Sequence, residues 1–220
     1  MSRVQLVEQV NSLSSLLVKM PNAPVGIAMG SVDKWIYDAQ MRGQLSISSD
    51  HVYLTPEQAC EMTYYRNQIH HLTLLVGLYL LVSKRYPKPL AQTVPKLIKA
   101  VYPYLAKELY WPWQGADVNK ALKEIRDLLV DQQLVIEEEK SLLVRNTALS
   151  VSLMQTVEPY LLRYYVVFRL LEGTGALTLD NLIDEAVRLA GLLHAEFGFQ
   201  SPEYTDSKGL AGFIIPSRIT

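Results

Sequence analysis

The stretch 56–84 constrains the fold of this sequence more than any other feature. It opens with a strong helix start, because Thr55 can cap the helix, Pro56 suits a first turn and Gln58 can complete a capping box. Its most apolar part, residues 72–82, is shorter than the roughly 20 residues that a membrane span needs. The pattern therefore predicts a long helix that other elements of a globular fold surround.

Composition sets broad limits on function. The chain has 220 residues and 49% hydrophobic content, so it can bury a real core. It carries 21 basic and 22 acidic residues, a balance without the global field that would attract nucleic acid, so we expect no nucleic-acid partner. The single cysteine, Cys60, excludes an intrachain disulfide and a zinc site built from several cysteines. No signal peptide is visible, and we expect a soluble globular unit without a cofactor.

Two helices are predicted before the long one. Ser2 can cap the first, whose inward face repeats at helical spacing through Leu6, Val10, Leu13, Leu17 and Met20. The segment 21–30 is a linker by composition. Ser31 opens a second helix with Trp35, Ile36 and Ala39 facing inward, and Gly43 ends it.

Two β-hairpins follow from short β-like stretches. The first joins 45–48 to 51–54 through Ser49-Asp50, and the second joins 134–136 to 142–144 around the glutamates 137–139. The two regions align as a weak repeat that pairs Ile36 with Ile125, Gln44-Leu45 with Gln133-Leu134, Ile47 with Ile136 and Asp50 with Glu139. A helix followed by a hairpin is the back half of a winged helix. Acidic turns do not suit DNA phosphates, so we assign this shape to packing between domains.

Further helices are predicted over 95–109, from a cap at Asp117, over 147–172 with Pro159 inside, over 179–196 capped by Thr178, and around 203–213. The fold class is therefore mainly α. We expect a helical bundle around a long central helix, with two small helix-plus-β-hairpin units of winged-helix type. The predicted division is residues 1–54, the N-terminal helices and first hairpin, and residues 55–220, the helical core with the second hairpin.

A candidate docking site lies on the long helix and consists of Tyr64, Tyr65, Arg66, Asn67 and His70. A cation inside an apolar helix needs a partner, because burying an unpaired charge is costly. That partner is either a group on another domain or an internal acid such as Glu108 or Glu158. The sequence contains no recognisable catalytic triad and no phosphate-binding loop. It also lacks the spacing of a metal site, since the adjacent His70 and His71 point about 100° apart on a helix and cannot bind one ion together.

Aromatic residues are frequent in the second half of the chain: Tyr102, Tyr104, Trp111, Trp113, Tyr160, Tyr164 and Tyr165. Such rings suit the boundary between lipid and water, so one interpretation is contact with a membrane surface. The other interpretation is ordinary packing in the core and at its rim.

Four sequence words resemble one known family in order and spacing. They are L-T-P-E-Q-A at 54–59, M-T-Y-Y-R-N-Q-I-H-H at 62–71, V-Y-P-Y-L-A-K-E-L at 101–109 and L-L-R-Y-Y at 161–165. The family is the large, membrane-associated bacterial glycerol-3-phosphate acyltransferases, in the C-terminal region that follows their catalytic domain. The resemblance implies transfer of an acyl group from acyl-CoA or acyl carrier protein to glycerol 3-phosphate, with peripheral location at the cytoplasmic side of the inner membrane.

The resemblance does not bring an active site. The family signature is His-x-x-x-x-Asp, but the fifth residues after the four histidines are Pro56, Leu75, Val76 and Phe199. We therefore expect an accessory or regulatory region whose partner is the catalytic domain of the same polypeptide. The alternative is a free-standing helical protein-interaction module. The last residues depart from the family, and Phe213-Ile214-Ile215 would favour self-association if exposed.

Overall fold

The computed structural model describes residues 1–20, 30–86, 90–109, 111, 113–173 and 178–197. Within these ranges, the structure does not describe the side chains of Cys60, Thr63, Asn67, Glu108, Leu109 and 194–197. The chain forms two compact units, Met1–Met154 and Gln155–Thr220. The predicted division at 54/55 stays a prediction.

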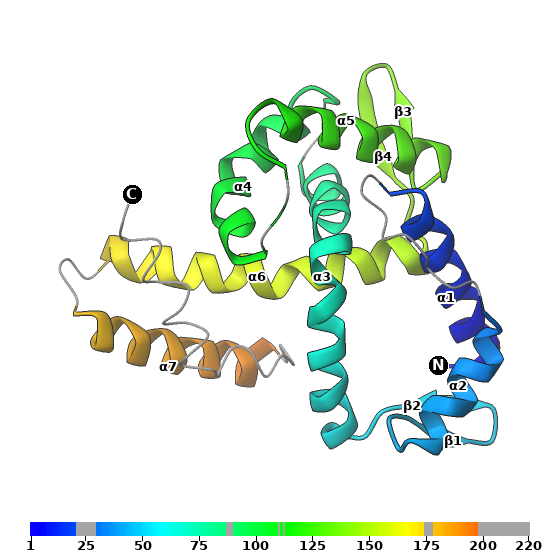
Figure 1. Ribbon diagram of the computed structural model, residues 1–220. Helices are drawn as coiled ribbons and strands as arrows, with labels where there is room; N and C mark the ends of the chain where they lie inside the picture. Colours follow the sequence, from blue (N-terminus) through cyan, green and yellow to red (C-terminus); the bar gives the residue numbers. More distant parts are fainter. Residues whose placement is uncertain (21–29, 87–89, 110, 112, 174–177, 198–220) are drawn as a thin grey trace. The chain divides into compact units, whose positions relative to one another are not determined.

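The fold is mainly α, as predicted, with two small antiparallel sheets of two strands each (Figure 1). The elements of the first unit are α1 (Arg3–Val18), α2 (Val32–Met41), β1 (Ser46–Ser48), β2 (His51–Tyr53), α3 (Pro56–Arg85), α4 (Val94–Leu109), α5 (Ala116–Asp131), β3 (Val135–Glu138) and β4 (Ser141–Val144). Helix α6 (Ala148–Gly173) begins in the first unit and continues into the second, which also holds α7 (Leu179–Phe197). The helix predicted around 203–213 and the linker at 21–29 lie outside the described residues.

Side-chain caps begin most of the helices where the sequence predicts them. Ser2 and Thr55 each form a complete capping box, and the hydroxyl of Thr178 accepts a hydrogen bond from the Asn181 backbone at 3.3 Å. The predicted cap of α5 was wrong by two residues. Gly115 takes the cap position with a φ of 52°, and Asp117 lies in the first turn, where its carboxylate still favours the helix dipole.

Both hairpins turn through two residues, and positive φ angles identify the turns. In the first, Ser49 has a φ of 56°. In the second, Glu139 and Lys140 both have positive φ, 47° and 74°, which is the requirement of a type I′ turn. The predicted turn at 137–139 was therefore misplaced. Glu137 and Glu138 belong to β3, because a two-residue type I′ turn matches the twist of the strands better than a longer acidic loop.

The predicted repeat is present in the structure, with a corrected alignment. The helix-ending positions with positive φ are Gly43 and Gln133, and the turn positions are Ser49 and Glu139. The sequence separation within each of these pairs is one residue longer than the separation between Ile36 and Ile125, which the sequence alignment paired. The sequence alignment slipped because it matched the two glutamines, Gln44 and Gln133, whereas the backbone matches the two turns.

Each hairpin is joined by a third short extended segment. Ser2 bridges to His51 in the first hairpin, and Leu90 bridges to Ser141 in the second. The order in both cases is extended segment, helix, helix and hairpin, which is the order of a winged helix. The chain thus contains two such units in tandem, α1–α2–β1–β2 and α4–α5–β3–β4.

The second winged-helix unit has the denser core. Helix α5 buries six residues, Val118, Ala121, Leu122, Ile125, Leu128 and Leu129, and the second half of α3 packs against α4, α5 and β4. In the first winged-helix unit, two predictions of burial were wrong. Trp35, predicted to face inward, is 38% exposed. Of the residues predicted to form the inward face of α1, only Met20 is buried, and it lies just beyond the helix. The buried residue within α1 is Leu16.

In the second compact unit, the buried side chains include Tyr164, Val167 and Leu182. The Arg163 guanidinium lies 5.1 Å from the centre of the Tyr160 ring, a cation–π contact within α6. Pro159 lies inside this helix, as the sequence predicts.

Candidate docking surface on the long helix

Helix α3 is tied at its start to the first winged-helix unit. The Gln58 side chain accepts a hydrogen bond from the Thr55 backbone at 2.9 Å and another from the Ser46 hydroxyl at 3.1 Å. Its Nε2 donates to the carbonyl oxygen of Gly43 at 2.7 Å. One capping side chain therefore sets both the helix start and its attachment to the preceding hairpin and to the end of α2.

The two halves of α3 have opposite surroundings. From Thr73 to Leu81 every side chain apart from Gly77 is at most 7% exposed, as expected for the apolar stretch. Tyr64, Tyr65 and Ile69, in contrast, are 67%, 45% and 42% exposed. One continuous helix thus serves as a core element at its end and presents large apolar side chains at its beginning.

These three exposed residues form what we call the exposed aromatic face: Tyr64, Tyr65 and Ile69. The two tyrosine rings meet edge to face, with centroids 5.8 Å apart and an interplanar angle of 78°. Ile69 is one helical turn after Tyr65, so its side chain extends the same surface. Exposed Glu61 and Gln68 lie on this side of the helix as well and give it a polar border.

The structure separates the predicted docking residues. Tyr64 and Tyr65 are exposed, Arg66 is half-buried, and His70 is buried at 1% exposure. The side chain of Asn67 lies outside the described residues. Ile69, which is 42% exposed, was not among the predicted docking residues. Its spacing from Tyr65 is the signal that could have grouped the two.

Buried aromatic residues hold the second half of α3. The Trp111 indole Nε1 donates a hydrogen bond to the His71 carbonyl oxygen at 3.1 Å, and its ring stacks on Tyr102 with centroids 5.2 Å apart. Tyr102 in turn donates from its hydroxyl to the Trp113 carbonyl oxygen at 2.7 Å, and burial raises its pKa. Core packing therefore accounts for Tyr102 and Trp111, which the membrane interpretation had included.

An ionisable group in the same core is Tyr79. Burial raises the pKa of its phenol to about 12, although the nearby Arg126 cation acts in the opposite direction. Arg126 forms a hydrogen-bonded ion pair with Glu137 that joins α5 to β3, and this bond raises the pKa of the guanidinium. Because the phenol is neutral and the two charges pair with each other, we interpret Tyr79, Arg126 and Glu137 as a structural cluster.

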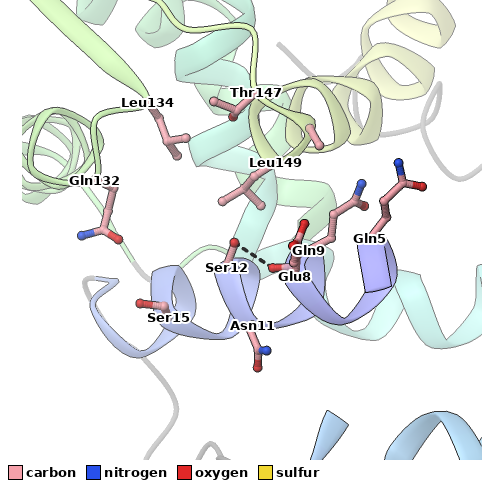
Figure 2. A pocket seen from close by; sticks show the side chains of 11 residues that line it. Gln5, Glu8, Gln9, Asn11, Ser12, Ser15, Gln132, Leu134, Thr147 and Leu149 are labelled. Atoms are coloured by element: carbon pink, nitrogen blue, oxygen red, sulfur yellow. Dashed lines mark hydrogen bonds between the residues drawn. The ribbon is translucent and has the colours of Figure 1, made fainter. Parts of the chain in front are cut away.

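A polar cavity of about 710 Å³ lies between α1 and the segment 132–149. Figure 2 shows Gln5, Gln9 and Ser12 projecting from α1 toward Leu134 and Leu149. Its lining is rich in amides and hydroxyls and includes one carboxylate, Glu8. No Lys, Arg or His is found among the described residues that line it. Such a lining does not suit a phosphate group, because nothing in it neutralises the charge.

Among the residues that the structure describes, no group of three or more His, Cys, Asp or Glu is arranged to hold a metal ion. None of the described helices combines the length and the apolar character needed to cross a bilayer.

Comparison with protein families decides the relationship that the four sequence words indicated. The model of the glycerol-3-phosphate acyltransferase C-terminal region matches residues 1–215. The chain belongs to this family. No solved structure matches it significantly.

Glycerol-3-phosphate acyltransferases of Shewanella species are among the relatives of this C-terminal region. The protein of Shewanella denitrificans is 29% identical over 220 residues, that of Shewanella baltica 28% over 223 residues, and that of Shewanella putrefaciens 27% over 214 residues. Each match covers 94% of this chain and 26% of the relative. The chain thus spans about a quarter of the length of the curated relatives that it matches.

Proposed function

We propose that this C-terminal region is a non-catalytic accessory part of a glycerol-3-phosphate acyltransferase. In this role it docks on the catalytic domain of the same polypeptide and supports or regulates acyl transfer from acyl-CoA or acyl carrier protein to glycerol 3-phosphate. The proposal includes a peripheral location at the cytoplasmic side of the inner membrane, as the family resemblance implies. Family membership and the quarter-length match support it.

The exposed aromatic face is the observation that carries the docking role. Tyrosine side chains are enriched at the energetic centres of protein interfaces, because each covers a large area with few rotatable bonds. Leaving Tyr64, Tyr65 and Ile69 exposed to water is unfavourable unless another surface covers them. Glu61 and Gln68 supply the polar rim that such interfaces usually have.

The spacing of the histidines and the lining of the polar cavity also favour a supporting role over a catalytic one. None of the four histidines is followed at the family spacing by an aspartate, so this region lacks the base and the orienting carboxylate that the resemblance implies for acyl transfer. None of the described residues that line the polar cavity is a cation that could neutralise a phosphate-bearing substrate. Both observations support the proposal that the longer part of the relatives carries out the chemistry.

A binding experiment tests the proposal. The 220-residue chain is mixed with the Shewanella denitrificans enzyme truncated before its own matching region, and the dissociation constant is measured by sedimentation or biolayer interferometry. We expect measurable binding that Tyr64→Ser with Tyr65→Ser weakens at least about tenfold, which is the usual effect of losing an interface anchor. Tyr37→Ser is the matched control, since Tyr37 is 57% exposed on α2.

The possible outcomes separate the two functional classes. Loss of binding in the α3 double variant but not in the Tyr37 control supports docking through the exposed aromatic face. Equal binding by all three proteins assigns docking to another surface. Absence of binding by the unaltered chain favours the free-standing interaction module instead.

A further inference from the structure

The two winged-helix units can be aligned at their extended segments. The Arg3 backbone N–H donates to the Asp50 carbonyl oxygen at 2.9 Å, and the Ala91 N–H donates to the Lys140 carbonyl oxygen at the same distance. The bridges Ser2–His51 and Leu90–Ser141 agree with this register. Arg3 is therefore the counterpart of Ala91, and the helices that follow, α1 and α4, are counterparts as well.

The same register aligns the apolar stripes of α1 and α4. Leu6, Val10, Leu13 and Leu17 correspond to Val94, Ile98, Val101 and Leu105. All eight positions are apolar and have the same spacing. The sequence therefore specifies the same packing face on both helices.

The two stripes differ in burial. Val94, Ile98 and Leu105 are fully buried, at 0% exposure each. Their counterparts Leu6, Val10 and Leu17 are all partly exposed. Since the residue types are equivalent, the difference lies in what covers the two helices.

The element that covers α4 is the second half of α3. It packs against α4, and it precedes the extended segment at Leu90 in the chain. Helix α1 packs chiefly against α2 and β2, and no helix in the described ranges occupies over α1 the place that α3 occupies over α4. The first winged-helix unit thus lacks one of the helices that complete the second.

We propose that an apolar helix from the polypeptide that precedes this region in the full-length enzyme docks on the α1 stripe (Leu6, Val10, Leu13 and Leu17). Its chemistry follows from its counterpart, residues 74–81 of α3, which is apolar on every side and makes about two turns of helix. The chain position follows from the repeat, in which the covering helix comes immediately before the extended segment. The inference rests on the proposed function, because it takes the catalytic part of the same polypeptide as the source of the helix.

The polar cavity does not compete for this helix. Gln5, Glu8, Gln9, Ser12 and Ser15 line the cavity, and they lie on a different side of α1 from the apolar stripe. A helix could therefore cover the stripe and leave the cavity open. The cavity is also an unfavourable binding site for an apolar helix, because such a helix would bury the amide side chains of the lining without giving them hydrogen bonds.

Hydrogen exchange tests the inference independently of enzyme activity. Amide exchange is measured in the 220-residue chain alone and in a chimera that joins it to the preceding part of the Shewanella denitrificans enzyme. We expect α1 amides to exchange at least about tenfold more slowly in the chimera, because a docked helix raises the free energy of local opening. Amides of α5, whose apolar side is already buried in the isolated chain, serve as the internal control and should not change.

Two additions make the result decisive. Val10→Asp should remove the extra protection of α1 in the chimera, whereas the control Tyr37→Ser should keep it. Unchanged α1 exchange in a chimera that transfers acyl groups overturns this inference and leaves the proposed function intact. Protected α1 in an inactive chimera supports the inference and contradicts only the part of the proposed function that concerns support of acyl transfer. Protection that appears in the isolated chain as its concentration rises assigns the stripe to a second copy and also overturns the inference.

Discussion

The side chain of Gln58 joins the start of α3 to the end of α2, since its Nε2 lies 2.7 Å from the carbonyl oxygen of Gly43 and donates a hydrogen bond to it. The same side chain completes the capping box with Thr55. A single residue therefore couples the formation of the long helix to the position of the first winged-helix unit.

Gln58→Ala should lower the free energy of unfolding by about 1–2 kcal/mol, because it removes part of a helix cap and two tertiary hydrogen bonds. Chemical denaturation followed by circular dichroism measures the change. Gln68→Ala is the control on the same helix, since Gln68 is exposed and should shift stability by less than about 0.5 kcal/mol. Equal stability of both variants would show that the Gly43 contact contributes nothing.

Tyr79 should make the protein sensitive to alkaline pH. Its folded-state pKa is about 12, above the ordinary value of 10, so the folded state binds the phenolic proton more tightly than the unfolded state does. This contribution to stability is complete below pH 10 and is lost as pH rises from 10 through 12, by about 3 kcal/mol.

Tyr79→Phe isolates that contribution. The Tyr79 hydroxyl is buried and has no hydrogen-bond partner among the described residues, so its removal should leave stability at pH 7 equal or raise it by up to about 1 kcal/mol. The difference between the variant and the unaltered protein should then widen between pH 10 and 12, as measured by urea unfolding at each pH. A constant difference across this range would mean that Tyr79 ionises as readily in the folded state as in the unfolded chain.

Leucine truncation should reveal the unequal burial of the two winged-helix units. Leu105→Ala, at a fully buried position, should cost about 2–5 kcal/mol, whereas Leu17→Ala, at the equivalent but partly exposed position, should cost about 1 kcal/mol. Thermal unfolding of the isolated chain compares the two directly. Similar losses at both positions would show that α1 is as well covered as α4.

The Arg126–Glu137 ion pair should couple α5 to β3. Both side chains are about one-third exposed, so solvent screens the pair and we expect a coupling energy of about 1 kcal/mol in a double-mutant cycle of Arg126→Met and Glu137→Gln. The coupling should decrease in 1 M salt. A salt-independent coupling would point to packing rather than charge.

The isolated chain should show no acyl transfer from acyl-CoA to glycerol 3-phosphate, because it lacks a His-x-x-x-x-Asp sequence. A radiolabelled glycerol 3-phosphate assay measures this, with the full-length Shewanella denitrificans enzyme as the positive control. Sustained turnover by the isolated chain would place the chemistry in this region and contradict the accessory role.

Local interactions made much of this fold predictable from sequence. Ser2, Thr55 and Thr178 cap helices where expected, since a cap needs only a side chain and a backbone N–H two or three residues away. The two hairpins were found because alternation and turn residues are also local signals. Even so, the second turn was misplaced, because several neighbouring positions in 137–140 are compatible with a turn and strand pairing selects among them.

The sequence by itself therefore determined where helices and hairpins form, and it located Tyr64 and Tyr65 on the long helix. Only the tertiary structure decided that these tyrosines and Ile69 are exposed while His70 is buried, and that α1 and α4, with equivalent apolar stripes, are covered to different extents. The physical reason is that periodicity specifies which side chains share a face, whereas burial depends on whether an element distant in the chain packs against that face.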